Sequence, residues 1–378
     1  MPDAGFGLYI HWPFCASKCP YCDFNSHVWA VVDQGEWATA FEQELDRVAA
    51  LTSDKVLSSV FFGGGTPSLM EGGTVDRLMN RIRRNWRLTN DLEVTLEANP
   101  TSIEAERFAA FRASGVNRVS VGVQALNDAD LKALGRLHSV EEALKAVDIA
   151  RNTFDRVSFD LIYARQNQSV TAWTDELQRA LSFDPDHLSL YQLTIEDGTA
   201  FGDRFKRGLL RGLPDEDLGA DLWEVTQSLC MDAGLPAYEV SNHAKIGNES
   251  RHNLIYWSSG DWAGIGPGAH GRLTLNGVRH ETVAHSAPRV WLDGVRSSGS
   301  GDSLFNALTN EAVLEERILM GLRKADGVEM PAGWLLTKES KINELSDFGL
   351  LDLKGSTLTV TEAGRPVLNA VIKGLLAD

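Results

Sequence analysis

The first half of the chain repeats one pattern, in which a short apolar run, closed by Gly, Pro, Asn or Asp, is followed by a longer amphipathic run. The apolar runs predict strands and the amphipathic runs predict helices. The predicted strands are Leu8–His11, Val56–Phe62, Glu93–Glu97, Arg118–Val123, Arg156–Ile162 and His187–Leu193. The predicted helices are Glu36–Leu51, Thr74–Trp86, Ser102–Ser114, Ala129–Leu134 with Val140–Asn152, and Thr171–Phe183. Because such alternation gives a parallel sheet with right-handed crossovers, we expect an α/β fold, a partial (β/α)6 barrel, with ligands at the carboxyl ends of its strands.

The alternation is less regular after Leu193. The later elements predicted are a helix over Leu218–Ala233, a strand over Ala237–Ser241, a turn-dense segment over Gly260–Gly271, helices over Glu311–Leu322 and Lys338–Leu345, and a β-hairpin over Leu351–Val360. A second unit begins near Asn306, and its helices followed by a hairpin are typical of a winged-helix-like module. We therefore divide the chain into a barrel over 1–235, an extension over 236–300 and a small C-terminal helical and winged module over 301–378.

Charge and hydropathy restrict the partners of the chain. Its 36 Lys and Arg against 52 Asp and Glu give a formal net charge of −16, which argues against broad nucleic-acid binding because phosphates need a positive surface. The N-terminus has no basic segment followed by an apolar run, and no apolar stretch is long enough to span a bilayer. We expect a cytoplasmic protein with no membrane span, and contact with a membrane surface stays open.

Three of the four cysteines, Cys15, Cys19 and Cys22, form a C-x3-C-x2-C motif just after the first predicted strand. Three thiolates on one tight loop can bind three irons of a [4Fe–4S] cubane and leave the fourth iron open for a substrate or cofactor. The alternative is a structural zinc site completed by His11 or His27. The remote Cys230 is predicted to be a small buried apolar residue.

This motif, at the end of a first barrel strand, resembles the radical S-adenosylmethionine (SAM) superfamily. The glycine-rich segment Gly63-Gly64-Gly65-Thr66 ends the second predicted strand and is similar to that superfamily's motif for the methionyl part of SAM. The resemblance implies that SAM binds the open iron through its amino and carboxylate groups. Glycines there would let a ligand approach the backbone closely.

Later strand ends resemble the coproporphyrinogen-oxidase-like branch of the superfamily, through Glu97-Ala98-Asn99-Pro100 and Ser120-Val121-Gly122-Val123-Gln124 among others. The resemblance implies a SAM site made by Tyr9, Tyr21, Gly64, Gly65, Thr66, Glu97, Gln124, Arg136 and Asp160. One departure is that Gln166-Asn167 stand where the family commonly has Pro-Gly. Asn can take the left-handed conformation of a glycine, so the turn can survive.

Within this branch, two families are compared. The oxygen-independent coproporphyrinogen III oxidases carry a further cysteine where this chain has Phe24, and they have an N-terminal extension. The heme chaperones of the HemW family have phenylalanine there and a signature that His252-Asn253-Leu254-Ile255-Tyr256-Trp257 matches in full. The chain therefore resembles the second family more closely.

The HemW resemblance implies heme binding, with His252 as the iron ligand and Tyr256 and Trp257 as part of the pocket. Arg251 is a candidate partner for a heme propionate. His252 could instead be a hydrogen-bonded core histidine, with His270 as another ligand candidate. The expected function is to bind heme and pass it to an acceptor protein, such as a respiratory protein. The alternative is a radical enzyme that oxidatively decarboxylates coproporphyrinogen III, for which no catalytic residue is assigned.

Overall fold

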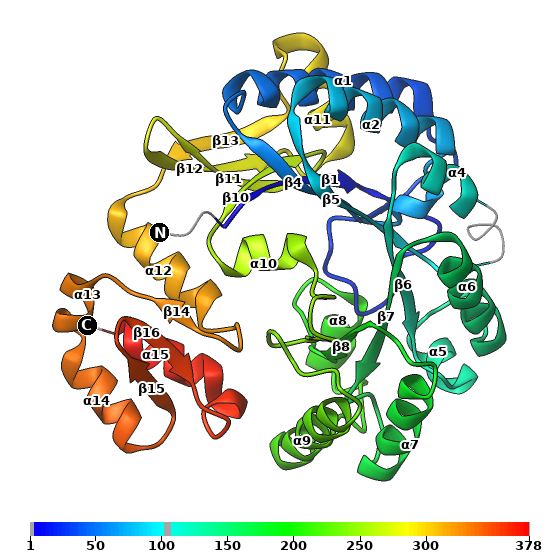
Figure 1. Ribbon diagram of the computed structural model, residues 1–378. Helices are drawn as coiled ribbons and strands as arrows, with labels where there is room; N and C mark the ends of the chain where they lie inside the picture. The colour runs from blue at the N-terminus through cyan, green and yellow to red at the C-terminus, as the bar shows by residue number, and fades with distance from the viewer. Residues whose placement is uncertain (1–3, 102–106, 378) are drawn as a thin grey trace.

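The computed structural model describes residues 4–101 and 107–377, and most of this chain is organised around one eleven-stranded sheet (Figure 1). The strands β10, β1, β4, β5, β6, β7 and β8 run parallel in this order. Their bounds are Asp261–Ile265, Phe6–Trp12, Val56–Gly64, Arg87–Ala98, Arg118–Gln124, Arg156–Tyr163 and His187–Gln192. All six predicted barrel strands are confirmed.

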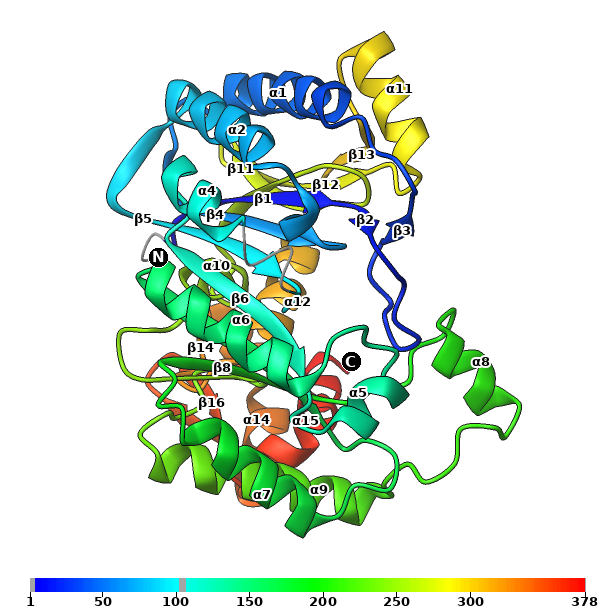
Figure 2. The ribbon, with the colours of Figure 1, turned by 90° about the vertical axis from the view of Figure 1, so that its right-hand side faces the viewer.

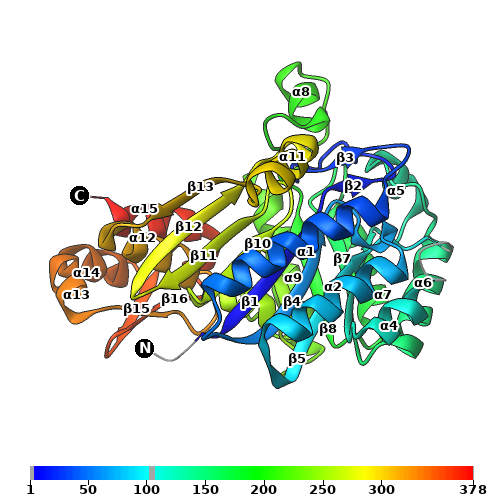
Figure 3. The ribbon, with the colours of Figure 1, turned by 90° about the horizontal axis from the view of Figure 1, so that it is seen from above.

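Antiparallel strands extend both ends of the parallel sheet. On one side lie β11 (His270–Leu275), β12 (Val278–Ala284) and β13 (Asp302–Ala307), and on the other lies β9 (Asn242–Ala244). Figure 3 shows β10 to β13 beside β1, although some 250 residues separate β1 from β10 in the sequence.

Helices cover the outer face of the sheet, and α10 lies on its inner face (Figures 1 and 2). The helices up to α10 are α1 (Gln34–Leu51), α2 (Gly72–Asn85), α4 (Phe108–Ser114), α5 (Asp128–Ala133), α6 (Val140–Thr153), α7 (Val170–Leu181), α8 (Ala200–Lys206), α9 (Glu216–Asp232) and α10 (Arg251–Trp257). Local sequence fixes several starts: Ser139 and Glu142 form a capping box at α6, and Asp215 caps α9. The predicted helix Ser102–Ser114 is described only from residue 107 onward.

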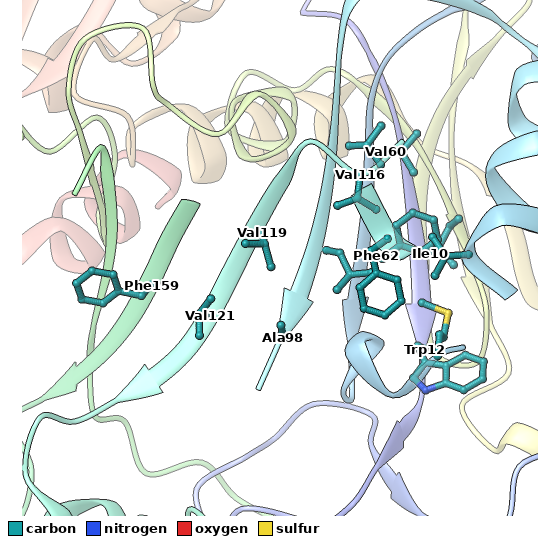
Figure 4. Packing of buried hydrophobic residues seen from close by; sticks show 14 of the residues in the cluster. Ile10, Trp12, Val60, Phe62, Ala98, Val116, Val119, Val121 and Phe159 are labelled. Carbon is teal, nitrogen blue, oxygen red and sulfur yellow. The ribbon is translucent and has the colours of Figure 1, made fainter. Parts of the chain in front are cut away.

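The outer face of the sheet is apolar. Val119 and Val121 of β6 and Phe159 of β7 are buried there against the helices, together with Ile10 and Phe62 (Figure 4). Alternate residues of the same strands face inward, because successive side chains of a strand point to opposite faces. Because the outer layer must be buried, the pairing register of the strands is fixed. The alternate residues therefore face the inner side of the sheet.

The C-terminal part has its own apolar cluster, which includes Ile318, Leu351 and Ile372. Its elements are α12 (Asn310–Gly321), β14 (Val328–Glu329), α13 (Ala332–Thr337), α14 (Glu339–Asp347), β15 (Leu351–Lys354), β16 (Thr357–Val360) and α15 (Leu368–Leu376). The predicted hairpin is confirmed as β15 and β16, and the two predicted helices as α12 and α14. The helix α11 (Pro288–Ser298) packs with α1, and β13 belongs to the large sheet. The three-part division of the chain stays a prediction.

Two predicted segments were wrong. Ala237–Ser241 forms only isolated bridges, because the buried Glu239 carboxylate accepts from the Ser241 backbone and the Asn242 side chain and so turns the chain before β9. The segment Gly260–Gly271 contains β10 and the start of β11 rather than only turns. Its glycines allow close strand packing, since a Cβ at Gly264 would meet the backbone of the neighbouring strand.

Candidate cofactor and ligand site

The clustered cysteines lie on a loop at the carboxyl edge of the sheet, as predicted (Figure 2). Two short paired strands, β2 (Phe14–Cys15) and β3 (His27–Val28), frame the loop. The end of β4 holds it, because the backbone N–H of Gly65 donates to the Trp12 carbonyl over 2.7 Å, and that of Thr66 donates to the Phe14 carbonyl over 2.9 Å.

Two cysteine sulfurs accept hydrogen bonds from residues of the predicted SAM site. Thr66 Oγ1 donates to Cys15 Sγ over 3.3 Å, and Arg136 Nη1 donates to Cys19 Sγ over 3.4 Å. Donors directed at sulfur stabilise the thiolate ligands of an iron–sulfur cluster. Burial raises the pKa of the Cys15 and Cys22 thiols, so a bound cation is needed to hold them as thiolates near neutral pH. This donor set fits a cluster on the three cysteines.

The zinc alternative needs His11 or His27 as a further ligand. Both ring nitrogens of His11 are engaged, Nδ1 with the Tyr9 hydroxyl and Nε2 with the Asn25 carbonyl, each over 2.9 Å. Within residues 4–101 and 107–377, no three Cys, His, Asp or Glu side chains converge on the position of a single metal ion. A cubane does not need such convergence, because its cysteine ligands bind different irons. The geometry favours the cluster.

Two carboxyl groups predicted to contact SAM share the inner face of the sheet. Burial and the charge of Asp160 raise the pKa of Glu97 to about 8, and burial raises the pKa of Asp160 to about 6. Glu97 Oε2 accepts from the backbone N–H of Gly64 over 3.2 Å, and Asp160 accepts from the Ser120 hydroxyl over 2.9 Å. A cationic group such as an ammonium would favour the ionised form of Glu97. The pair therefore suits a ligand that carries a positive charge.

Arg136 connects the cysteine loop to the neighbouring strand ends. Besides its bond to Cys19, it donates through Nη2 to Asn99 Oδ1 over 2.7 Å and to the Gly122 carbonyl over 3.0 Å. Asn99 in turn donates to Thr66 Oγ1 over 3.2 Å. Burial of Tyr21 raises its pKa, and its ring lies beside Arg136 and Cys19. The structure therefore brings several predicted SAM residues into one hydrogen-bonded network.

The backbone at these strand ends adopts unusual conformations. Gly64 has a φ of 108°, and Gln124 has a φ of 71°, which is uncommon for a residue other than glycine. A Cβ at Gly64 would meet the His11 ring, and one at Gly65 would meet the Phe14 carbonyl. The packing of the cysteine loop therefore requires these glycines, whether or not a ligand also approaches the backbone there.

The loop that departs from the family pattern keeps its turn. Asn167 has a φ of 57°, so the prediction that it replaces a glycine conformation is confirmed. Its backbone N–H donates to the Gly212 carbonyl over 2.6 Å, and the buried Arg165 pairs with Glu176 over 2.5 Å and with Asp130 over 2.9 Å. These contacts hold the loop after β7 in place.

A cavity of about 480 Å³ lies on the inner face of the sheet, between the strands and α10. The residues predicted for SAM or heme that line it are Tyr9, Glu97, Asp160, His252, Tyr256 and the alternative ligand candidate His270. Phe61 and Trp262 give it apolar walls, and Met320 from α12 reaches it from the C-terminal part. Apolar walls with a few polar groups are typical of a pocket for an organic ligand.

His252 is buried in this wall, with only 1% of its surface exposed. Its Nδ1 pairs with the Ser59 hydroxyl over 2.7 Å and its Nε2 with the Tyr256 hydroxyl over 2.6 Å. Burial and the charge of Arg118 lower its pKa to about 3, so the ring is neutral. A neutral imidazole can ligate iron, but here one of the two hydrogen bonds must first break. The role of His252 as a heme ligand therefore stays a prediction.

The other residues predicted for heme differ in position. His270 lines the same cavity and is an exposed residue. Trp257 is not among the lining residues, which agrees with its position one residue beyond Tyr256 on the helix. Arg251 pairs with Asp91 over 2.6 Å on the surface. Arg251 therefore lies away from the cavity in the structure.

The polar inner face of the barrel was not predicted from the sequence. Arg118, Ser120, Asp160, His187 and Ser189 all line the cavity, and only Asp160 was predicted to bind a ligand. The pattern that could have found them is the strict alternation of polar and apolar residues, as in Arg118-Val119-Ser120-Val121. In a buried parallel strand such alternation is unusual, since both faces are normally apolar.

The chain resembles known proteins over almost its whole length. Residues 9–169 match the model of the Radical SAM superfamily. The chain is 36% identical to "Heme chaperone HemW" of Escherichia coli K12, over 98% of both chains. It is 39% identical to "Radical S-adenosyl methionine domain-containing protein 1, mitochondrial" of Mus musculus, over 98% of this chain and 87% of the mouse protein. The chain belongs to the HemW family of radical SAM proteins.

A solved structure confirms the fold of this HemW-family chain. The coproporphyrinogen III oxidase HemN from Escherichia coli overlaps it with a TM-score of 0.82 at 22% identity, over 99% of this chain and 91% of that one. This similarity confirms the predicted α/β barrel, and the family match with the 36% identical relative confirms the predicted radical SAM resemblance. Membership of the superfamily implies a [4Fe–4S] cluster and SAM. No helix in the described part of the chain is long and apolar enough to cross a bilayer.

Proposed function

We propose that this protein binds heme and transfers it to an acceptor protein, with a [4Fe–4S] cluster and SAM at the carboxyl edge of its barrel. The observation that carries this proposal is the 36% identity to a protein named as a heme chaperone, which extends over 98% of both chains. The full match of 252–257 to the family signature supports it. The acceptor, such as a respiratory protein, and a cytoplasmic location are part of the same proposal.

Cys15, Cys19 and Cys22 would hold the cluster, which when bound supplies an open iron and one-electron chemistry. Around it, Arg136 and Thr66 direct donors at the sulfurs. Glu97 and Asp160 offer carboxyl groups on the inner face, and Tyr9 closes that face beside His11. These residues would bind and orient SAM, and the buried wall around them would exclude water.

Heme would occupy the cavity beside α10. The apolar walls from Phe61 and Trp262 suit the flat porphyrin face, and His252, Tyr256 and His270 are the polar groups near it. His252 would become a ligand by exchanging its bond with the Tyr256 hydroxyl for one with iron. Under this proposal, heme and SAM would bind to neighbouring parts of the same inner face.

The test is an anaerobic reconstitution followed by a titration with heme and transfer to an apo-heme protein. We expect the reconstituted protein to develop a Soret band and to lose it when the apo-acceptor is added in excess. If no Soret band develops, or if bound heme never leaves, the proposed transfer is wrong. The same preparation, titrated with SAM, reports on the cluster site separately.

Decarboxylation of coproporphyrinogen III is the alternative function, because the coproporphyrinogen III oxidase HemN has the same fold. That similarity carries the fold alone, and Phe24 stands where those oxidases have a further cysteine. We therefore expect no protoporphyrinogen IX over many turnovers when reduced protein is given SAM and coproporphyrinogen III. Chromatographic detection of that product would favour the oxidase instead.

A further inference from the structure

The cavity wall contains an arginine that none of the preceding assignments uses. Arg118 begins β6 and points to the inner face, and only 3% of its surface is exposed. It is the one arginine or lysine among the residues that line the cavity in the described part of the chain. A guanidinium stays charged in proteins, so this site carries a permanent positive charge.

The contacts of Arg118 within the protein are weak. Nη1 donates to the Thr95 hydroxyl over 3.5 Å and Nη2 to the Ser158 hydroxyl over 3.4 Å, both at the limit of a hydrogen bond. Its Nε is buried and has no partner. None of the ion pairs found in the described residues includes Arg118, whereas its neighbour Arg156 pairs with Glu93 over 2.7 Å.

The nearby acidic groups do not neutralise this charge. Glu93 is committed to Arg156 and to the backbone N–H of His252. Asp160 accepts from Ser120, and Glu97 accepts from the Gly64 backbone. Burial raises the pKa of Asp160 and the charge of Arg118 offsets only part of this effect, and the two groups make no direct ion pair. A buried charge without a close partner is costly, and an incoming anion would offset that cost.

We propose that Arg118 binds a carboxylate of the ligand that enters this cavity. The inference rests on the proposed function, under which the carboxylate is a propionate of heme. Arginine binds carboxylates through its N–H donors, and the two Nη groups of Arg118 have only weak hydrogen bonds to exchange for such a ligand. Phe61 and Trp262 supply apolar walls for the remainder of the ligand. The porphyrin would then enter with one propionate toward the floor of the barrel.

This assignment replaces Arg251, the propionate partner suggested by the sequence. Arg251 is exposed enough to pair with Asp91 outside the cavity, so it has a counter-ion already. Arg118 and Arg251 therefore provide a matched pair of variants. Each variant removes one guanidinium group, but only the Arg118 variant removes it from the cavity wall.

The experiment compares heme with its dimethyl ester, in which both propionates are neutral, on the full-length reconstituted protein. We expect the wild type to bind heme roughly 10- to 100-fold more tightly than the ester, the usual range for a charge-assisted pair. Arg118→Gln should abolish this preference, and Arg251→Gln should keep it. Coproporphyrin III, which carries four propionates, serves as a second probe and should show the same dependence on Arg118.

The outcomes separate this inference from the proposed function. Heme binding without preference over the ester, or an unchanged preference in Arg118→Gln, overturns the role of Arg118 and leaves heme binding intact. If the wild type binds neither heme nor coproporphyrin III, both proposals fall. If Arg118→Gln does not fold, Arg118→Lys is tested instead, because lysine keeps the positive charge but lacks the planar guanidinium with its several N–H donors. A preference in Arg118→Lys equal to that of the wild type would then overturn the inference.

Discussion

Arg136 donates a hydrogen bond to the sulfur of Cys19 over 3.4 Å, although the two residues are 117 positions apart in the chain. The same guanidinium reaches the ends of β5 and β6 through Asn99 and the Gly122 carbonyl. A single side chain thus joins the cluster loop to the strand ends proposed to bind SAM. Its removal should therefore affect both the cluster and the cofactor.

Arg136→Met should weaken SAM binding about tenfold, because it leaves Asn99 without a charged donor. It should also lower the reduction potential of the cluster, since a positive donor to sulfur is lost. Calorimetry with SAM and a potentiometric titration followed by electron paramagnetic resonance measure the two effects. Arg136→Lys should restore part of the potential. An unchanged potential in Arg136→Met would show that this bond does not reach the cluster.

Cys19→Ala should abolish the iron–sulfur absorbance, because two thiolates are unable to retain a cubane. Cys15→Ala and Cys22→Ala should behave alike. The control is Cys230→Ala, since Cys230 is buried in the apolar core far from the loop in the sequence, and it should leave iron and sulfide content intact. Retention of four irons in Cys19→Ala would contradict the assignment.

Gly64→Val should lower both the thermal stability and the affinity for SAM. Its φ of 108° is strained for valine, and the new Cβ would meet the His11 ring. Gly73→Ala is the matched control, because nothing lies within 4 Å of its Cβ position, and it should be neutral or stabilising by up to about 1 kcal/mol. Differential scanning calorimetry with and without SAM measures both effects. Wild-type melting and SAM affinity in Gly64→Val would argue against this account.

Glu97 should make the stability of the cofactor-free protein depend on pH. Its folded pKa, about 8, lies above the usual value of 4.5, so the native state holds the proton longer and stability falls as pH rises between these values. Glu97→Gln should reduce this loss by an amount on the order of 2 kcal/mol. Denaturant unfolding at pH 5 and pH 8.5 tests the difference. The exposed Glu141→Gln variant serves as a control. If Glu97→Gln loses as much stability as the wild type between pH 5 and pH 8.5, Glu97 is not the source of the pH dependence.

His252→Ala should lower heme affinity and shift the Soret band, while the cluster absorbance stays unchanged. The variant removes the imidazole and also frees the Ser59 and Tyr256 hydroxyls, so His252→Gln is measured beside it to keep polar partners for both. His270→Ala tests the other imidazole on the cavity. If only His270→Ala shifts the Soret band, the ligand is His270 and His252 is a core histidine.

The sequence predicted the parts of the fold that depend on local pattern. The six barrel strands and most of their helices follow from apolar periodicity, and the cysteine motif was placed at the right edge because loop signals mark the ends of strands. The conformation of Asn167 also followed from its residue type. These features depend on residues close together in the chain, so a short stretch of sequence is enough to predict them.

Features set by distant contacts were not predictable in this way. The sequence predicts turns at β10, because the glycines that permit its close packing against β11 are also typical turn residues. The partners of His252 include Ser59, which is 193 positions away. Arg118 has only weak hydrogen bonds, while Glu93 forms its ion pair with Arg156. Such outcomes follow from competition between contacts in three dimensions.

The position of β10 beside β1 has a consequence for how the protein is made. During synthesis, β1 emerges first, yet one of its two edges stays open until Asp261–Ile265 leaves the ribosome. An open edge can pair wrongly with other chains, and contacts between distant segments form slowly. The helix α10 directly precedes β10, so its part of the cavity wall forms at the same late step. The cysteine loop is therefore translated long before the sheet beside it is complete, and nascent chains would have to be protected from oxidation during that interval.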